Sequence, residues 1–237
     1  MSKNVGLIIP AFEEEPRIDP VVRCAVDSGL FSKIAVVDDG SRDQTLEVAR
    51  EYPVHTLRHV RNLGKGAALQ TGFDYLEDQD IVLLLDADLV GVTPGHLESL
   101  IKPLCDAPHL GMTVARFIEG RYAVDLQQKW FAILNGQRAL SQELIRRLPN
   151  LAWSRFGVEV LMTRFARDLG VPGTQVMWPA VTHYTKEEKF GPLMGFYARM
   201  KMYAEVLKAQ ALYPLQRGRF ILEAEDWDSP MELDAMD

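Results

Sequence analysis

Two aspartates follow a short apolar run in the first half of the chain. Asp86 and Asp88 come directly after the five apolar residues 81–85, a run that predicts a strand buried on both faces. Residues two apart in an extended segment point the same way, so both carboxylates can face one cation. Oxygen ligands suit Mg²⁺ or Mn²⁺ better than zinc, and such a cation could neutralise a diphosphate leaving group. The alternative is an acidic surface turn, because this pattern alone is a weak signal.

Acids also follow other expected strands in the first ninety residues. Short apolar runs at 5–9, 34–37 and 54–57 alternate with expected helices at about 19–29, 43–50 and 67–76. This alternation predicts an α/β fold with a parallel sheet and right-handed crossovers, in which ligands bind outside the carboxyl ends of the strands. Residues 13–15, Asp38-Asp39 and Asp86-Asp88 end three of these strands. The sequence therefore predicts that their carboxylates converge on a site for a nucleotide and a metal ion.

The pattern is less regular after residue 90. We expect helices at 93–104, 126–133, 142–148, 158–169 and 193–213, and strands at 111–117 and 175–178. One domain over 1–222 fits the length, with a nucleotide-binding half at about 1–90, an acceptor half at about 91–190 and the helix at 193–213. An acidic, loosely ordered tail is expected at 223–237.

Composition excludes several classes of protein. The 237 residues carry a formal net charge of -7, which argues against broad binding of nucleic acid. The two cysteines, Cys24 and Cys105, lie far apart, as is typical of thiols in a reducing compartment. The sequence has neither a signal peptide pattern nor an apolar run near the roughly 18–20 residues that span a bilayer. We expect a cytoplasmic protein whose oligomeric state stays open, a dimer being compatible with the sequence.

Four motifs occur in order at the expected strand ends. They are Pro10-Ala11-Phe12-Glu13-Glu14, Val36-Val37-Asp38-Asp39-Gly40-Ser41, Asn62-Leu63-Gly64-Lys65-Gly66 and Asp86-Ala87-Asp88. Together they resemble family 2 glycosyltransferases with the GT-A fold, including the dolichyl- and polyprenyl-phosphate enzymes. The resemblance implies a Rossmann-like, mostly parallel sheet flanked by helices. It also implies metal-dependent transfer of a hexose from a UDP- or GDP-sugar to a hydroxyl or phosphate acceptor, with Mg²⁺ or Mn²⁺ as cofactor.

The resemblance also implies roles for single residues of the donor site. Glu14 matches the family's acid near the nucleoside, whereas Glu13 replaces the usual asparagine. Asp38 or Asp39 would accept a hydrogen bond from a base N–H, since a carboxylate is an acceptor only. Asp88 would bind the metal. The predicted nucleotide-sugar site comprises Pro10, Phe12, Glu14, Asp38, Asp39, Lys65, Gly66, Asp86 and Ala87.

Residues in the second half are expected to complete the site. The resemblance implies that His183 is a third metal ligand, the alternative being a surface histidine. Asp88 and Glu159 are the catalytic candidates. Glu159 would be a general base or simply an acid favoured at a helix start. Gly136, Arg138 and Arg155 are expected to contact the acceptor, although a structural turn and a solvated charge would explain them equally well.

Several alternatives stay open at this point. Glu-Gly-Arg-Tyr at 119–122 faintly resembles retaining enzymes that act on glycerate or phosphoglycerate, in which Glu159 would position the acceptor. A sugar-phosphate nucleotidyltransferase would normally carry a glycine-rich loop with arginine after the first strand, where this chain has Pro10 and three glutamates. A nucleotide-sugar-binding protein without activity is the third class. The mixed basic and apolar residues at 199–203 leave peripheral membrane contact open, but a packed helix is favoured, and the charged run at 186–189 is expected to be solvated.

Overall fold

The computed structural model describes residues 3–118 and 136–227 of the chain. Side chains are described up to residue 217, with two exceptions in the segment 186–190. The helix expected at 126–133 and the segment 119–122, whose resemblance to retaining enzymes was noted above, lie outside the described residues.

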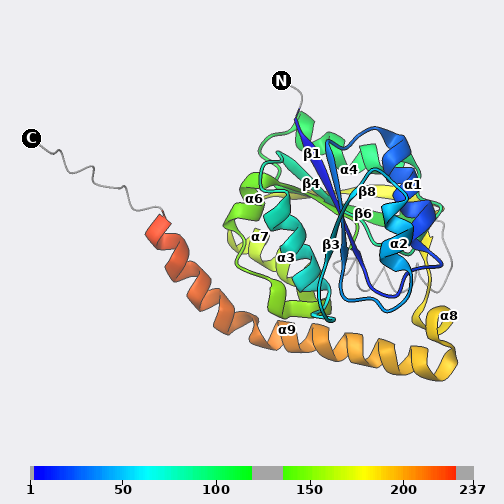
Figure 1. Ribbon diagram of the computed structural model, residues 1–237. Coiled ribbons are helices and arrows are strands. Elements are labelled where there is room, and N and C mark those ends of the chain that lie inside the picture. The colour runs from blue at the N-terminus through cyan, green and yellow to red at the C-terminus, as the bar shows by residue number, and fades with distance from the viewer. Residues whose placement is uncertain (1–2, 119–135, 228–237) are drawn as a thin grey trace, which may run out of the picture.

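A mixed sheet runs through the centre of the described chain (Figure 1). Its order is β3-β2-β1-β4-β7-β6-β8, and β7 is antiparallel to both of its neighbours while the other pairs are parallel. The strands are β1 (Val5–Ala11), β2 (Lys33–Asp38), β3 (His55–Arg58), β4 (Ile81–Leu84), β6 (Met112–Ile118), β7 (Arg138–Ser141) and β8 (Gly173–Pro179). The expected α/β fold with a mostly parallel sheet is confirmed.

Helices cover both faces of this sheet. One face carries α1 (Ile18–Ser28), α2 (Thr45–Arg50) and α4 (Pro94–Asp106), and the other carries α3 (Lys65–Tyr75), α6 (Gln142–Arg147) and α7 (Val158–Asp168). A short 3-10 helix at Ala152–Gly157 precedes α7. Both faces of the central strands are therefore buried, which explains their continuous apolar sequences.

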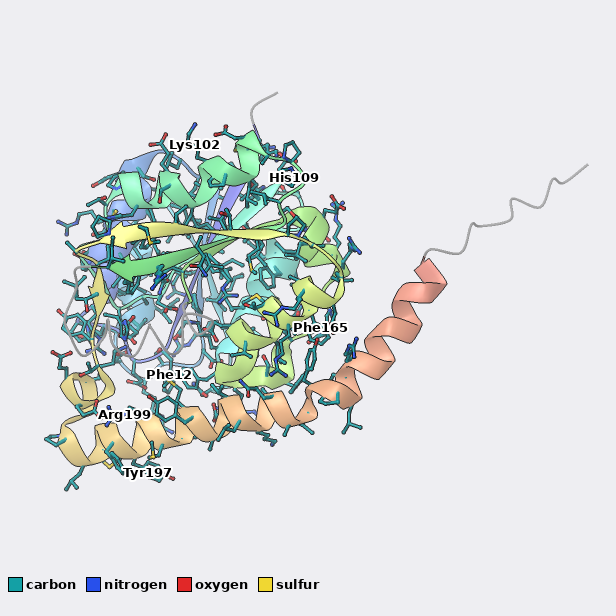
Figure 2. All side chains as sticks on the ribbon, turned by 180° about the vertical axis from the view of Figure 1, so that it is seen from behind. Phe12, Lys102, His109, Phe165, Tyr197 and Arg199 are labelled. Atoms are coloured by element: carbon teal, nitrogen blue, oxygen red, sulfur yellow. The ribbon has the colours of Figure 1, made fainter. Side chains whose placement is uncertain are left out.

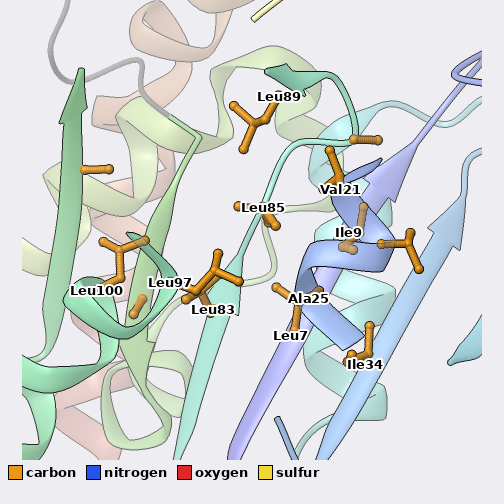
Figure 3. Close-up of a cluster of buried hydrophobic side chains, with 14 of the residues drawn as sticks. Leu7, Ile9, Val21, Ala25, Ile34, Leu83, Leu85, Leu89, Leu97 and Leu100 are labelled. Carbon is orange, nitrogen blue, oxygen red and sulfur yellow. The ribbon is translucent and has the colours of Figure 1, made fainter. Parts of the chain in front are cut away.

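The alternation along β1 divides the core into two layers. Leu7 and Ile9 pack with α1 and α4 on one face, whereas Ile8 packs with α3 on the other. Figure 3 shows the first of these layers, in which side chains from helices meet those from strands. The labelled residues from the helices are Val21, Ala25, Leu97 and Leu100, those from the strands are Leu7, Ile9, Ile34, Leu83 and Leu89, and Leu85 directly follows β4.

A second, two-stranded sheet joins distant parts of the chain. β5 (Leu89–Val90) pairs antiparallel with β9 (Thr182–His183), and Leu89 lies opposite His183. The residue after the second aspartate of the Asp86-Ala87-Asp88 motif is thereby fixed beside the candidate histidine ligand. Sequence separation would not have indicated this contact.

Two helices end the described chain. α8 (Lys186–Phe190) is followed by α9 (Pro192–Trp227), which lies along one end of the molecule and changes direction in its second half, where Pro214 lies (Figure 1). Among residues with described side chains, α9 buries Val206, Ala209 and Tyr213. The helix is longer than the predicted 193–213 and includes the start of the segment expected to be a loose tail. In the described part of the chain, no helix combines the length and apolar character that crossing a bilayer requires.

Candidate active site

The carboxyl ends of the parallel strands open toward the end of the molecule where α9 lies. Figure 2 shows Phe12, which follows β1, toward the same end as Tyr197 and Arg199 of α9, while Lys102 and His109 lie at the opposite end. Register supports this arrangement, because Ala11 of β1 lies opposite Asp38 of β2. The acids that follow β1, β2 and β4 therefore share one edge of the sheet, as the sequence predicts. We call this edge the mouth.

The loop after β1 is fastened to the loop after β2. The backbone N–H of Glu13 donates to Ser41 Oγ at 2.9 Å, and that of Glu14 donates to Thr45 Oγ1 at 2.8 Å. Glu13 adopts a positive φ of 56°, which is uncommon outside glycine. Ahead of this turn, Phe12 is exposed. These bonds orient the first loop so that the Glu14 carboxylate lies at the mouth.

Asp39 holds the glycine-rich loop in place. Its carboxylate accepts from the backbone N–H of Leu63 at 2.8 Å and of Gly64 at 2.7 Å, and it contacts His59 Nδ1 at 2.7 Å. The side chain is buried, so these bonds offset its desolvation. His59 was not among the predicted site residues, because a histidine after a short strand carries no motif. Its contact with Asp39 places it in the structural support of the mouth.

Asp38 is also buried but is less fully bonded. Its Oδ1 accepts from the backbone N–H of Ser41 at 3.0 Å. Its Oδ2 lies 3.2 Å from Arg58 Nε and makes no aligned hydrogen bond within the described chain. A carboxylate oxygen can accept two bonds, so Asp38 keeps unused acceptor capacity, although its side chain is fully buried in this structure.

Lys65 lies between two acids that are far apart in sequence. Its Nζ is 2.5 Å from Asp86 Oδ1 and 2.6 Å from Glu159 Oε1. The backbone N–H of Asp86 donates to Gln137 Oε1 at 2.9 Å, and Gln137 Nε2 donates to Asp86 Oδ2 at 2.8 Å. Antiparallel β7 begins beside the end of β4, which brings Gln137 to this position. Nothing in the sequence pointed to Gln137, because its role depends on this strand pairing.

The charges of this group shift its pKa values. Burial favours neutral Lys65, but attraction by Asp86 and Glu159 outweighs burial and raises the pKa of Lys65 above its usual range. Burial also disfavours ionised Asp86, yet the charge of Lys65 and the hydrogen bonds from Lys65 and Gln137 lower the pKa of Asp86 to about 2. Lys65 and Asp86 are therefore both ionised at neutral pH.

Gly136 leaves the space that this group occupies. A Cβ at this position would lie 2.6 Å from Asp86 Oδ2 and 2.7 Å from Lys65 Nζ. At these distances a Cβ would force the ends of the Asp86 and Lys65 side chains to shift. Gly136 therefore leaves room for these two charged groups and lies beside Asp86 at the mouth.

The structure places Arg138 inside the protein rather than on its surface. The side chain is fully buried and donates to the backbone carbonyl of Glu159 at 3.1 Å and to Thr163 Oγ1 at 3.2 Å. Burial lowers the pKa of Arg138 to about 10. Arg138 joins β7 to α7 and is fully buried in this structure, so a structural role is what its contacts show, and its contact with the acceptor stays a prediction.

Arg155 lies at the rim of the mouth, on the outside of the glycine-rich loop. It donates to Asn62 Oδ1 at 3.0 Å and to the carbonyl of Leu63 at 3.1 Å, and it pairs with Glu205 of α9 at 3.0 Å. Its φ of 48° is positive, a strained value for a residue with a long side chain. These contacts tie α9 to the loop that carries Lys65, and the predicted acceptor contact stays a prediction.

Lys189 of α8 departs from the expectation that the charged run at 186–189 is solvated, whereas Glu188 of the same run is exposed. The side chain of Lys189 is 3% exposed, its Nζ lies 2.5 Å from Asp88 Oδ2, and it also pairs with Glu14. Glu14 accepts in addition from Arg17 Nε at 2.5 Å. Two acids from separate strand ends therefore share one buried ammonium group.

The donor set at the mouth fits a hard divalent cation. Asp88 presents a carboxylate with 15% of its side chain exposed. The backbone pairing of Leu89 with His183 brings the histidine onto the strand beside this motif, and its ring lies 6.3 Å from the ring of Phe117. Carboxylate with imidazole is a ligand combination that Mn²⁺ accepts, and carboxylate with water suits Mg²⁺. Within residues 3–118 and 136–227, no three acidic, histidine or cysteine side chains form a ready cage. A cation here would therefore complete its coordination with other oxygens.

Comparison with known sequences gives a consistent result. The family model described as glycosyl transferase family 2 matches residues 7–165. Human dolichyl-phosphate beta-glucosyltransferase is 31% identical over 121 residues, which cover 44% of this chain and 37% of that protein. Dolichol-phosphate mannosyltransferase of Pyrococcus furiosus is 32% identical over 127 residues, covering 49% of this chain and 34% of that protein. The matched segment spans well under half the length of these relatives.

Solved structures show the same architecture. Glucosyl-3-phosphoglycerate synthase from Mycobacterium tuberculosis, in complex with Mn²⁺, UDP-glucose and phosphoglyceric acid, superposes with a TM-score of 0.70. The superposition covers 88% of this chain and 79% of that chain at 24% sequence identity, so it shows a shared fold. With the family model matching more than half of the sequence, the chain belongs to glycosyltransferase family 2 and has the GT-A fold.

Proposed function

We propose that this protein transfers a hexose from a nucleoside diphosphate sugar to an acceptor that carries a phosphate or another acidic group. One observation carries the proposal. The carboxylates of Glu14, Asp86 and Asp88 and the ammonium groups of Lys65 and Lys189 lie at one mouth of the sheet. Acids with a purely structural role on separate loops would not be expected to share the same ammonium groups. A site that binds a metal ion, a diphosphate and a sugar requires carboxylates and cationic side chains in close contact.

The donor would lie across the ends of β1, β2 and β4. Asp38 would accept from the base N–H, and Glu14 would lie on the nucleoside side. Lys65 and Gly66, in the first turn of α3, would lie on the same side of the donor. A Cβ on Gly66 would lie 2.6 Å from the backbone carbonyl of Leu151, so this glycine lets the start of α3 pack closely against the 3-10 helix. Pro10, Phe12 and Ala87 would line the same site. A uracil or a guanine base presents the N–H groups that this acceptor requires.

Mg²⁺ or Mn²⁺ would be held by Asp88 and His183, with Asp86 contacting its water ligands or the ribose. When bound, the cation supplies positive charge to the departing diphosphate. The chain's own contribution is to orient these ligands, since Gln137 and Lys65 fix the carboxylate of Asp86 from both sides.

Glu159 and Lys65 would face the sugar and the acceptor. Glu159 is 6% exposed at its side chain and is held by Lys65. In an inverting reaction Glu159 would take the proton of the attacking hydroxyl, and in a retaining reaction it would orient the acceptor. The names of the dolichyl-phosphate relatives and the phosphoglyceric acid in the solved complex both point to phosphate-bearing acceptors, which is why we favour this class.

A binding panel followed by a transfer assay tests the proposal. A ligand that binds the folded state increases the free energy of unfolding by roughly 2.7 kcal/mol at a hundredfold excess over Kd. The melting temperature rises accordingly. We expect UDP- or GDP-sugars to raise it in the presence of Mn²⁺. Sugar transfer should then be detected with a polyprenyl phosphate or with 3-phosphoglycerate, and glycerol serves as the acceptor without a phosphate. Release of pyrophosphate from a nucleoside triphosphate and a sugar phosphate would instead identify a nucleotidyltransferase.

The variant Asp88→Asn tests the cation site directly. It should reduce transfer by at least about a hundredfold, the scale seen when one electrostatic contact to a transition state is removed. The matched control is Asp106→Asn, which removes an aspartate that pairs with Lys102 at the surface and should leave transfer unchanged. Undiminished transfer by Asp88→Asn would show that the metal assignment is wrong.

A further inference from the structure

Lys189 has no role in the proposed chemistry, yet it is among the least accessible groups at the mouth. Its Nζ lies 2.5 Å from Asp88 Oδ2 and also pairs with Glu14, and its side chain is 3% exposed. Glu14 belongs to the loop after β1, and Asp88 follows β4. One ammonium group therefore joins the nucleoside side of the mouth to the carboxylate that we assign to the metal.

The short segment that carries Lys189 has further contacts with the mouth. The guanidinium of Arg17 lies 5.9 Å from the ring centre of Tyr184, a cation–π distance, and Arg17 also pairs with Glu14. α8 begins with a reciprocal cap, in which the N–H of Thr185 donates to Glu188 and the N–H of Glu188 donates to Thr185. Residues 184–190 therefore form a defined unit between His183 and α9.

This unit also has a boundary at which it can turn. Gly191 separates α8 from α9 with a φ of 77°, a value that favours glycine. Arg199 of α9 pairs with Glu187 of α8 at 3.0 Å. A displacement of Lys189 by rotation at Gly191 would therefore have to break or carry along the ion pair between Arg199 and Glu187.

The charges at Asp88 set up a competition. Among the described residues, Lys189 is the one cation within ion-pair distance of Asp88, whereas Glu14 pairs with both Arg17 and Lys189. A divalent cation bound to Asp88 and an ammonium group on the same carboxylate repel each other, strongly so where access to water is low. Asp88 therefore cannot bind the divalent cation and pair with Lys189 at the same time without weakening both interactions.

Building on the proposed function, we propose that Lys189 and the divalent cation exchange at Asp88. Without donor, Lys189 neutralises Asp88 and holds α8 across the mouth. When the cation arrives with the donor, the ammonium leaves Asp88 and pairs with the diphosphate, whose negative charge the cation neutralises only in part. The same lysine thus opposes binding of the free metal and favours binding of the metal with its nucleotide.

This exchange gives the variant Lys189→Met two effects of opposite sign. In the absence of nucleotide, Mn²⁺ should bind about tenfold more tightly than to the wild type, because the competing ammonium is gone. At saturating Mn²⁺, UDP should bind about tenfold more weakly, because the diphosphate has lost a cationic partner. Each effect corresponds to about 1.4 kcal/mol. A lysine with a purely structural role would not change the two affinities in opposite directions.

Mn²⁺ binding is measured by the loss of its free electron paramagnetic resonance signal, and UDP binding is measured by calorimetry. Lys189→Arg keeps the charge and should retain the wild-type order of affinities. Lys33→Met removes a lysine that pairs with Asp78 at the surface and should change neither affinity. Both readouts are independent of enzymatic activity.

A measurement on the wild type covers the case in which Lys189→Met does not fold. Amide hydrogen exchange at residues 184–190 should accelerate at least severalfold when Mn²⁺ is added alone and slow again when UDP is added with it. Unchanged exchange with Mn²⁺ alone would overturn the proposal.

The outcomes separate this inference from the proposed function. If the wild type binds UDP-sugars with Mn²⁺ but Lys189→Met binds free Mn²⁺ no more tightly, the exchange is refuted and the transferase proposal stands. If the wild type binds neither Mn²⁺ nor UDP, the proposed function fails and the exchange fails with it.

Discussion

Replacing Lys65 by methionine would remove the ammonium between Asp86 and Glu159 while keeping a side chain of similar length. The two carboxylates would stay where they are, with 26% and 6% of their side chains exposed. Asp86 would keep its hydrogen bond from Gln137, and both acids would keep the longer-range attraction of buried Arg138. Among the described residues, Lys65 is the cation in ion-pair contact with both acids. Lys65→Met therefore leaves poorly solvated negative charge without its counter-ion.

The expected cost follows from this burial. Removing one partner of a buried ion pair destabilises a protein by about 3–5 kcal/mol, because the remaining charge stays desolvated without compensation. Partial exposure of Asp86 and its bond to Gln137 favour the lower end of that range. We expect Lys65→Met to lose about 3 kcal/mol of unfolding free energy at pH 7.

The dependence on pH provides a sharper test. In the wild type, the pKa of Asp86 is about 2 in the folded state, below the ordinary value of 3.8. The stability from this shift is thus present above about pH 4 and is lost as the pH falls toward 2. In Lys65→Met, burial still disfavours the charged form while the lysine is gone, so the folded-state pKa rises. The free energy of unfolding of the variant should therefore increase as the pH falls from 7 to 5. Over the same range, Asp86 should leave the unfolding free energy of the wild type nearly unchanged.

Urea unfolding, followed by circular dichroism at pH 7 and pH 5, measures both effects. The control variant Lys33→Met removes a lysine whose Nζ lies 2.6 Å from Asp78 Oδ2, with both side chains largely accessible; surface pairs contribute little. If Lys65→Met and Lys33→Met lost the same unfolding free energy, with the same dependence on pH, the placement of Lys65 between the two acids would be refuted.

Three further results are expected. Gly136→Ala should weaken UDP binding about tenfold in calorimetry, because its Cβ would displace the ends of the Asp86 and Lys65 side chains, which would otherwise lie 2.6 and 2.7 Å away. Gly66→Ala should cost about 1–3 kcal/mol of stability in urea unfolding, since its Cβ would overlap a backbone carbonyl that cannot easily move. Burial and the hydrogen bond to Asp168 raise the pKa of Tyr213 to about 12, so the associated stability should be lost as the pH rises from 10 to 12, and Tyr213→Phe should lack that loss in thermal unfolding.

The sequence was informative where local pattern and topology coincide. Apolar runs that end in acids located β1, β2 and β4, because a strand in a parallel sheet is buried on both faces and the ligand edge follows its last residue. That reasoning placed Glu14, Asp39 and Asp86 at one edge of the sheet, where the structure has them. It did not distinguish acids that face a ligand from an acid such as Asp39, which fastens a loop through backbone N–H groups.

The sequence was least informative about residues whose environment comes from distant parts of the chain. A lysine in the run Lys-Glu-Glu-Lys has the composition of a solvated turn, and only the docking of α8 against the mouth buries Lys189. Arg138 lay near expected acceptor residues, but β7 places it between the sheet and α7. Gln137 is a hydrogen-bond partner of Asp86 because β7 pairs antiparallel with β4. The sequence pattern of a four-residue strand cannot indicate this pairing.

The shared ammonium of Lys189 has a consequence for dividing this chain. Glu14 and Asp88 both lie before residue 90, yet their common counter-charge is supplied about a hundred positions later. A shortened protein that ends after the donor motifs would carry the acids that follow β1, β2 and β4. It would lack Glu159, this lysine and the glutamine that hydrogen-bonds to Asp86. The nucleotide-binding half and the acceptor half therefore depend on each other for the charges of the mouth. A chimera that exchanges one half between relatives would have to preserve the pairing of Lys189 with Glu14 and Asp88 as well as the motifs.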